Sequence, residues 1–318
     1  MTTSVINKEL FLEINGIEQY VLICGQDRSN PILLMIHGGN PQTAYFKKYN
    51  AELEENFLVV YWEQRGTGKS YCKTINQDSI TLENHVEDAY VLTKYLQNKF
   101  NKGKIFILGH SLGSLIAIKT VEKYYNEYIA YIGVSQMTDQ RESDTLAIEY
   151  ITQKATHYND KKSLKMIEKF ADMPISKELV LKRLQLAQKM MLKYGGFLYD
   201  TSILGMFKMG IIPLFTSKIY SFRDMINVFR LSKSRIYLSY EYNILESVKS
   251  LNIPIYLLHG KEDYLLSYVL AKEFYEKLSA PKKEFITFTY SAHLLPFDEA
   301  EKFNNILIEK VLEDNVDR

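Results

Sequence analysis

One serine stands in a segment whose spacing is typical of a catalytic nucleophile. Ser111 is the middle residue of GHSLG at 109–113, after the apolar run 104–108 and before a run with helical spacing. Such a strand, turn and helix force the serine into a strained turn and push its Oγ out above a sheet, at a helix N-terminus that stabilises negative charge. We predict that Ser111 attacks a carbonyl. His110 is expected at the edge of the substrate site as a packing residue, not as the base.

A glycine-rich loop offers the backbone groups that acyl transfer also needs. The segment HGGNP at 37–41 follows another short apolar run, and glycine lets backbone N–H groups approach a substrate closely. We expect the N–H groups of Gly39 and Leu112 to hold the oxyanion, a role in which losing one donor costs about 10²–10³ in rate. The other loop residues that we expect to contact the substrate or support the turn are Gly38, Asn40 and His37.

An acid and a histidine follow two later apolar runs. Asp263 ends the segment GKED and His293 ends the segment SAH, so the chain order is Ser111, Asp263, His293. In acyl transfer the histidine takes the serine proton and later gives it to the leaving group, while the acid orients the imidazole. Two other carboxylates remain candidates for the orienting role, Glu262 and Asp139.

A second glycine-containing loop, EQRGTGKS at 63–70, resembles a phosphate-binding loop only superficially. Neither the spacing GxxxxGK[ST] nor GxGxxG is present, so we do not expect nucleotide binding. We predict a structural loop beside the active site, in which a carboxylate anchors Arg65.

Short apolar runs precede these motifs and must position them. Runs of this length that are apolar on both faces are typical of buried parallel strands; they are Ile32–Ile36, Phe57–Trp62, Ile105–Leu108, Ile129–Val134, Ile255–Leu258 and Phe285–Phe288. Segments with helical spacing lie between several of them: Leu82–Phe100, Leu112–Tyr125, Leu270–Leu278 and Glu299–Leu312. An Asn15-Gly16 turn predicts an opening hairpin. The alternation predicts the α/β class with a mostly parallel sheet.

The alternation stops between about Asp139 and Val248. This stretch is helix-rich, poor in strand signals and contains most of the methionines. An insertion explains it more economically than an independent domain, so we predict a core at 1–138 and 249–318 and a helical cap at 139–248. The Met- and Phe-rich segment Met206–Phe215 either lines an apolar pocket or forms the core of the cap.

Composition excludes several classes of protein. The 318 residues carry 39 Lys+Arg and 38 Asp+Glu, so a net charge of +1 favours neither nucleic acid nor an anionic membrane. The two cysteines form no disulfide or metal-binding pattern, and we expect neither metal nor cofactor. No apolar window suits a transmembrane helix and no signal peptide opens the chain. We expect a cytoplasmic protein that acts on a small molecule or short peptide.

Taken together, the motifs resemble those of the α/β-hydrolase superfamily, and most of all those of proline iminopeptidases. The matching segments, in order, are HGGNP, EQRGTGKS, GHSLG, GKED and SAH. This resemblance implies a sheet flanked by helices, a serine hydrolase with a Ser-His-Asp triad, and a mostly helical cap inserted after the sixth strand.

The resemblance also bears on the substrate. Aminopeptidases of this family hold the free amine with carboxylates of the cap, which here singles out Glu149 and Glu241, with Glu142 and Glu178 as further candidates. Leu112 stands where many iminopeptidases have Trp, and GHSLG is equally similar to esterases and lipases. The first expectation is therefore an aminopeptidase that releases N-terminal residues. The alternatives are a carboxylesterase and, third, a ligand-binding protein without enzymatic activity.

Overall fold

The structure is a computed structural model that describes residues 5–200, 202–210, 212–230 and 232–315. The described residues form one eight-stranded sheet in the order β1-β2-β4-β3-β5-β6-β7-β8. The strands are β1 (Ile6–Ile14), β2 (Ile17–Gly25), β3 (Ile32–Ile36), β4 (Leu58–Glu63), β5 (Ile105–His110), β6 (Tyr128–Val134), β7 (Ile255–Gly260) and β8 (Lys283–Phe288). Strand β2 runs antiparallel to β1 and β4, and the other neighbours are parallel. The predicted α/β class and the opening hairpin are confirmed.

The central strands are buried on both faces, as their continuous apolar runs predict. In β3 the side chains alternate between two cores: Ile32, Leu34 and Ile36 pack on one face, and Leu33 and Met35 pack on the other. Successive residues of a strand point to opposite faces, so only a run that is apolar throughout can fill both cores. The sheet is therefore a rigid middle layer for the loops at its ends.

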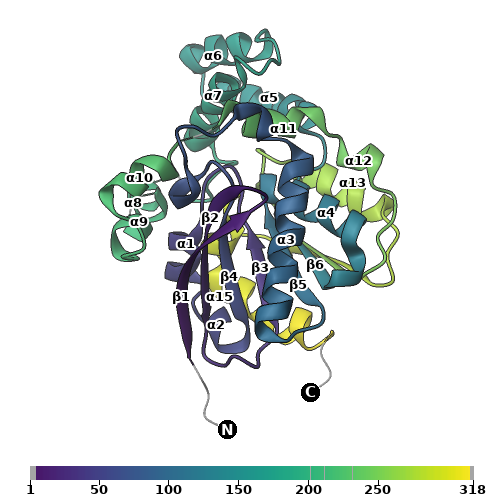
Figure 1. The fold of residues 1–318 in the computed structure, drawn as a ribbon. Helices are drawn as coiled ribbons and strands as arrows, with labels where there is room; N and C mark the ends of the chain where they lie inside the picture. Colours follow the sequence, from purple (N-terminus) through teal and green to yellow (C-terminus); the bar gives the residue numbers. More distant parts are fainter. Residues whose placement is uncertain (1–4, 201, 211, 231, 316–318) are drawn as a thin grey trace.

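Helices cover both faces of the sheet (Figure 1). One face packs against α3 (Leu82–Phe100), α4 (Leu112–Tyr124) and α13 (Tyr268–Lys277). The other packs against α1 (Thr43–Tyr49), α2 (Leu53–Asn56), α14 (Leu295–Asp298) and α15 (Ala300–Asn305). The helix expected over Glu299–Leu312 divides instead into α15 and a π-helical segment, η4 (Ile306–Leu312). The short 3₁₀ segments are η1 (Gly68–Ser70), η2 (Gln77–Ser79) and η3 (Tyr125–Glu127).

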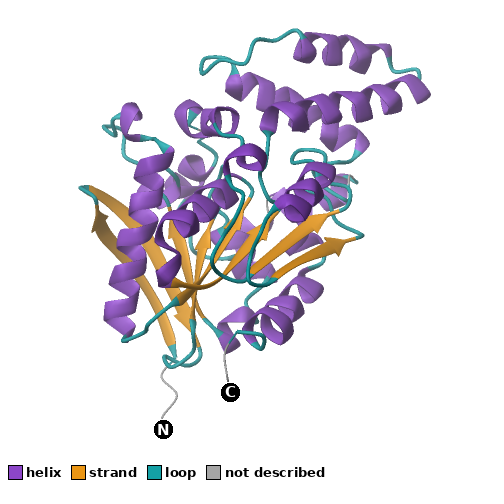
Figure 2. Cartoon of the chain, turned by 90° about the vertical axis from the view of Figure 1, so that its right-hand side faces the viewer, coloured by secondary structure: helices purple, strands orange, loops and turns teal. Residues whose placement is uncertain are grey.

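A long helical segment separates β6 from β7. Its helices are α5 (Gln140–His157), α6 (Lys161–Ala171), α7 (Val180–Tyr194), α8 (Ile203–Gly210), α9 (Ile212–Thr216), α10 (Phe222–Val228), α11 (Lys233–Glu241) and α12 (Ile244–Ser247). We refer to α5–α12 as the cap. Figure 1 shows α5, α6, α7 and α11 above one end of the sheet and α8–α10 to one side, and Figure 2 shows the layer of helices above that end in a view turned by 90°. Part of the cap has its own small core, in which Ile151, Phe170, Met190 and Met191 are buried together. None of the helices in the described ranges is both long and apolar enough to cross a membrane.

Candidate active site

Ser111 lies at the tip of a sharp turn between β5 and α4. Its backbone has φ 56° and ψ −128°, a conformation that is costly for a residue with a Cβ. The flanking glycines are required by close packing: a Cβ on Gly113 would collide with the carbonyl oxygen of Ile36, and one on Gly109 would collide with the next turn of α4. The strand, turn and helix therefore hold the half-buried serine on the cavity wall, in the position expected of a nucleophile elbow.

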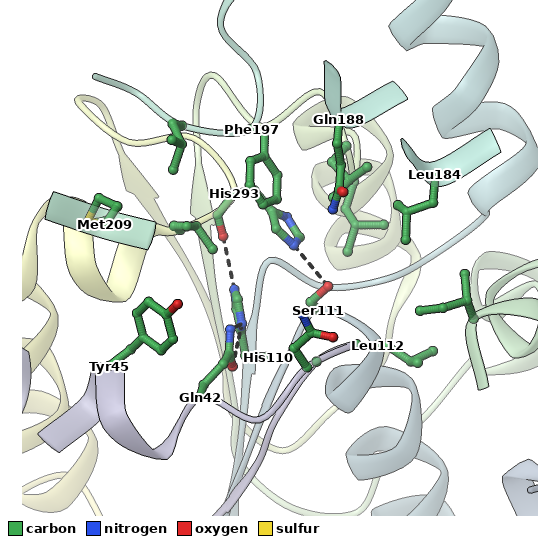
Figure 3. A pocket seen from close by; sticks show the side chains of 18 of the residues that line it. Gln42, Tyr45, His110, Ser111, Leu112, Leu184, Gln188, Phe197, Met209 and His293 are labelled. Atoms are coloured by element: carbon green, nitrogen blue, oxygen red, sulfur yellow. Dashed lines mark hydrogen bonds between the residues drawn. The ribbon is translucent and has the colours of Figure 1, made fainter. Parts of the chain in front are cut away.

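The structure brings Ser111, His293 and Asp263 together. The Nε2 atom of His293 lies 2.9 Å from Ser111 Oγ (Figure 3). Its Nδ1 lies 2.9 Å from Asp263 Oδ2. A carboxylate only accepts, so Nδ1 carries a proton that it donates to Asp263, and Nε2 is free to accept the proton of Ser111. The arrangement allows proton transfer from the hydroxyl to the imidazole.

Asp263 is buried and firmly held. Its Oδ1 accepts hydrogen bonds from the backbone N–H groups of Leu265 (3.0 Å) and Leu266 (2.9 Å). Burial alone would raise the pKa of Asp263, but the adjacent His293 and these N–H groups outweigh it and lower the pKa. The group is therefore a carboxylate, placed to orient the ring of His293.

The two rival acids lie elsewhere. Asp139 caps the N-terminus of α5, where its Oδ1 accepts from the backbone of Arg141 and Glu142 at 2.8 and 3.2 Å. Glu262 precedes Asp263 in the loop after β7 but makes none of the described hydrogen bonds to His293. Geometry therefore selects Asp263 as the partner of the histidine.

His110 supports the histidine loop and does not face Ser111. Its Nε2 lies 3.0 Å from the backbone carbonyl of His293, to which it donates, and its Nδ1 lies 2.7 Å from the side-chain amide nitrogen of Gln42. Burial lowers the pKa of His110 to about 3, so the ring is neutral. Ser135 Oγ donates to the same carbonyl at 3.1 Å. Sequence reasoning missed Gln42 and Ser135, because neither belongs to a motif.

The HGG loop lies directly against the nucleophile. A Cβ on Gly38 would lie 2.9 Å from the Cβ of Ser111, so only glycine allows this approach. Gly38, Gly39, Asn40 and Leu112 all line the cavity in front of Ser111. Leu112 is the first residue of α4, and the first N–H groups of a helix have no partner within the helix. The N–H groups expected to bind an oxyanion thus border the cavity.

The EQRG segment supports this loop, and its arginine is anchored as predicted. The guanidinium of Arg65 binds both carboxylate oxygens of Asp88 at 2.6 Å. Gln64 donates from its side-chain nitrogen to the His37 carbonyl at 3.0 Å, and its backbone N–H donates to His37 Nε2 at 3.2 Å. The interpretation of the segment as a structural loop, and of His37 as a supporting residue, is confirmed.

The cavity has a volume of about 420 Å³, and most of its lining is apolar. Leu184 and Gln188 point toward it from α7, and Phe197 stacks on the ring of His293 with centroids 5.6 Å apart (Figure 3). From the segment 206–215, Met209 and Gly210 line the cavity, while Leu214 is buried in a small separate cluster. Among the described residues, no Asp, Glu, Lys or Arg lines this cavity.

Comparison with known proteins places the chain in a family. The family described as "Serine aminopeptidase, S33" matches residues 27–184. "Probable aminopeptidase YbaC" of Bacillus subtilis (strain 168) is 31% identical over 304 residues, covering 93% of this chain and 93% of that protein. The chain belongs to the S33 serine aminopeptidase family of α/β-hydrolases. It is a hydrolase, related to aminopeptidases and similar in fold to esterases.

More distant matches include a curated protein and two solved structures. A proline iminopeptidase of Thermoplasma volcanium is 27% identical over 115 residues, which cover 36% of this hydrolase and 37% of that protein. An esterase of Exiguobacterium antarcticum has a TM-score of 0.62 at 18% identity, covering 96% of this chain and 99% of that one. A proline iminopeptidase-related protein of Thermus thermophilus has a TM-score of 0.60 at 18% identity, covering 98% and 99%. At such identities the structural likeness shows the fold alone.

The residues expected to bind an amine lie away from the cavity described above. Glu149 and Glu241 are exposed and lie outside the cavity, as do Glu142 and Glu178. In α5 the buried residues include Ala147 and Ile151, four apart on one face, and Glu149 falls between them on the outer face. Glu241 ends α11 directly after the buried Tyr240, so its side chain leaves the packed face.

Proposed function

We propose that this hydrolase is a serine esterase or amidase that acts through an acyl-enzyme on substrates with an uncharged, apolar acyl group. The observation that carries the mechanism is the strained Ser111, whose Oγ lies 2.9 Å from His293 Nε2. Nucleophile, base and orienting acid within hydrogen-bond reach are the signature of nucleophilic acyl transfer.

The steps follow from the atoms in place. His293 Nε2 takes the proton of Ser111 as Oγ bonds to the substrate carbonyl carbon, and the carbonyl oxygen becomes an oxyanion. The N–H groups of Gly39 and Leu112 hold that oxyanion. The imidazolium, stabilised by Asp263, protonates the leaving alcohol or amine as its bond to the carbonyl carbon breaks. Water then attacks the carbonyl carbon of the acyl-enzyme while His293 Nε2 takes its proton. The imidazolium returns that proton to Ser111 Oγ as the acyl–oxygen bond breaks, which releases a carboxylic acid and free Ser111.

The cavity supports the choice of acyl group. Its size suits a small ligand, and leucine, phenylalanine and methionine side chains dominate its lining. A charged acyl group would lose its hydration there without gaining a partner of opposite charge. An apolar acyl chain, by contrast, gains about 25 cal/mol for each Å² removed from water.

An aminopeptidase is the second candidate, and the full-length relative favours it. An N-terminal ammonium needs acceptors, which in this cavity would be amide oxygens. The Gln140 side-chain nitrogen donates to Asp144 Oδ1 at 3.0 Å and to the Leu265 carbonyl at 3.3 Å, which leaves its oxygen as an acceptor. Gln188 supplies a second amide on the cavity wall.

The two candidates separate in one comparison of rates. p-Nitrophenyl esters of increasing acyl length would be compared with aminoacyl arylamides, each with a free and with a blocked amine, on wild type and Ser111→Ala. The proposal predicts that ester hydrolysis rises with acyl length and that blocking the amine does not harm cleavage of amides. Cleavage of free-amine amides alone would establish the aminopeptidase instead, and activity retained by Ser111→Ala would refute the mechanism.

A further inference from the structure

Arg235, in helix α11 of the cap, is a fully buried cation with neutral partners. It is 0% exposed, and its Nη2 donates to the carbonyl of Gly38 at 2.8 Å and to Gln64 Oε1 at 2.5 Å. Nη2 also lies 3.4 Å from the carbonyl of His37, and Nη1 donates to His85 Nε2 at 2.8 Å. Among the described residues, no carboxylate forms an ion pair with this guanidinium.

The two histidines beside Arg235 do not add charge. His85 Nδ1 lies 2.6 Å from the carbonyl of Thr81, to which it donates, so its Nε2 is an unprotonated acceptor for Arg235. Burial and the neighbouring guanidinium hold the pKa of both His37 and His85 well below the usual range. The positive charge of this buried cluster therefore belongs to Arg235 alone.

Two other buried arginines show how unusual this is. Arg65 pairs with Asp88 at 2.6 Å, and Arg183 pairs with Asp144 at 2.7 Å. A buried charge without a counter-ion is expensive, because the protein must replace its hydration with dipoles alone. Burial lowers the pKa of Arg235 for the same reason. Such a charge destabilises the folded protein. It becomes favourable only when a negative charge develops nearby during function.

The carbonyl that Arg235 binds belongs to the peptide of the expected oxyanion donor. The Gly38 carbonyl and the Gly39 N–H are the two ends of one planar trans peptide, so they point in opposite directions. The same carbonyl accepts from His37 Nδ1 at 2.9 Å. Two donors at the oxygen end therefore fix the direction of the N–H at the other end. A charged donor also polarises the peptide and strengthens its N–H as a donor.

We propose that Arg235 is a positioning residue for the oxyanion site: it orients and polarises the Gly38–Gly39 peptide and places an uncompensated positive charge behind it. The inference rests on the acyl-transfer function proposed above. It assigns to the cap a part in stabilising the transition state, in addition to covering the substrate. Preorganised dipoles and charges act most strongly where negative charge develops in a site shielded from water.

The test separates transition-state stabilisation from folding. Arg235→Met should lower kcat by about 10–100-fold, a share of the loss typical for an oxyanion donor, with KM within about twofold of wild type. An alkyl trifluoromethyl ketone forms a tetrahedral oxyanion adduct with a reactive serine, and its inhibition constant should rise by the same factor as kcat falls. Arg235→Lys keeps the charge and should recover part of both quantities.

Arg183→Met is the matched control. Arg183 is also a buried arginine of the cap, but it donates to Asp144 and to the carbonyls of Phe170 and Met173, away from the HGG loop. This variant should lower the melting temperature without changing the affinity for the trifluoromethyl ketone. If Arg235→Met fails to fold, Arg235→Lys still tests the inference, because this variant too should have a lower kcat with little change in KM.

Two results would overturn the inference. One is a wild-type kcat and inhibitor affinity in folded Arg235→Met or, if that variant does not fold, in Arg235→Lys; the other is a loss confined to KM. Ser111→Ala, measured in parallel, separates this failure from that of the proposed function. If Ser111→Ala is inactive while the Arg235 variants behave like wild type, only the role of Arg235 is refuted. If Ser111→Ala remains active, the acyl-transfer mechanism itself is wrong.

Discussion

Asp263 uses both carboxylate oxygens, and this determines which tautomer of His293 can exist. Oδ1 accepts from two backbone N–H groups and Oδ2 accepts from His293 Nδ1. The sequence motifs predicted Ser111, Asp263 and His293 because each lies in a short loop directly after a strand, where local spacing carries the information. Gln42, Ser135 and Arg235 could not be predicted in this way, because distant segments bring them to the site and no local pattern marks them.

Asp263→Asn tests the tautomer directly. The Leu265 and Leu266 N–H groups require an acceptor, so the Asn oxygen should face them and its NH₂ should face His293. The ring must then present a lone pair at Nδ1 and a proton at Nε2, and it can no longer accept the proton of Ser111. We expect kcat to fall by about 10³–10⁴-fold with little change in KM. Glu262→Gln is the control and should leave kcat unchanged; equal losses in both variants would contradict the assignment.

At the scale of the elements, the end of β4 connects the sheet to the cap. Glu63 is fully buried and accepts from Thr43 Oγ1 at 3.1 Å and from the Lys69 N–H at 2.7 Å, and the hydroxyl of Tyr220 in the cap also donates to it. Continuous apolar runs predicted the strands well, because a strand buried on both faces leaves little ambiguity. Which face of each cap helix is buried could not be predicted, since this depends on the neighbouring helices in the same insertion.

Glu63 predicts how stability depends on pH. Burial raises the pKa of Glu63 from 4.5 to about 7, so the folded state binds a proton more tightly than the unfolded state. The free energy of unfolding should therefore fall as pH rises from about 4.5 to about 7, by on the order of 2 kcal/mol from this group. Urea unfolding at pH 5 and pH 8 measures the difference.

The matched variant for this titration is Glu63→Gln, which cannot ionise. It should lose a clear part of the pH dependence, whereas Glu149→Gln, on the exposed face of α5, should retain all of it. Asp298 should retain a share in every variant, since burial also raises its pKa to about 7. An unchanged pH dependence in Glu63→Gln would show that Glu63 is ionised at low cost in the folded protein.

At the scale of the whole molecule, the cap and the sheet enclose a cavity whose described lining carries no charged Asp, Glu, Lys or Arg side chain. The sequence predicted that a helical insertion would cover the site. It could not show which helix faces would line the cavity, and the carboxylates expected there, Glu149 and Glu241, lie outside the described lining. Substrate choice is thus a property of the assembled molecule, beyond the reach of its motifs.

Changing the charge of the cavity should change the substrate class. Gln188→Glu introduces a carboxylate on the cavity wall at nearly constant volume. We expect about a tenfold lower kcat/KM for apolar esters and a higher kcat/KM for free-amine aminoacyl arylamides, because a half-buried carboxylate on the cavity wall favours an ammonium and disfavours an apolar chain. Glu149→Gln and Glu241→Gln should change neither class by more than about twofold. A selective loss of activity on free-amine substrates in those two variants would support the expectation that Glu149 and Glu241 bind the amine.

The most direct test of the central claim is to identify the residue that a fluorophosphonate labels. Wild-type protein should be labelled once, and mass spectrometry of its peptides should place the phosphonate on Ser111. Ser111→Ala should take up no label and hydrolyse no ester, and His293→Ala should be labelled far more slowly because no base accepts the hydroxyl proton. Label on another residue, or ester hydrolysis that persists in Ser111→Ala, would contradict the account.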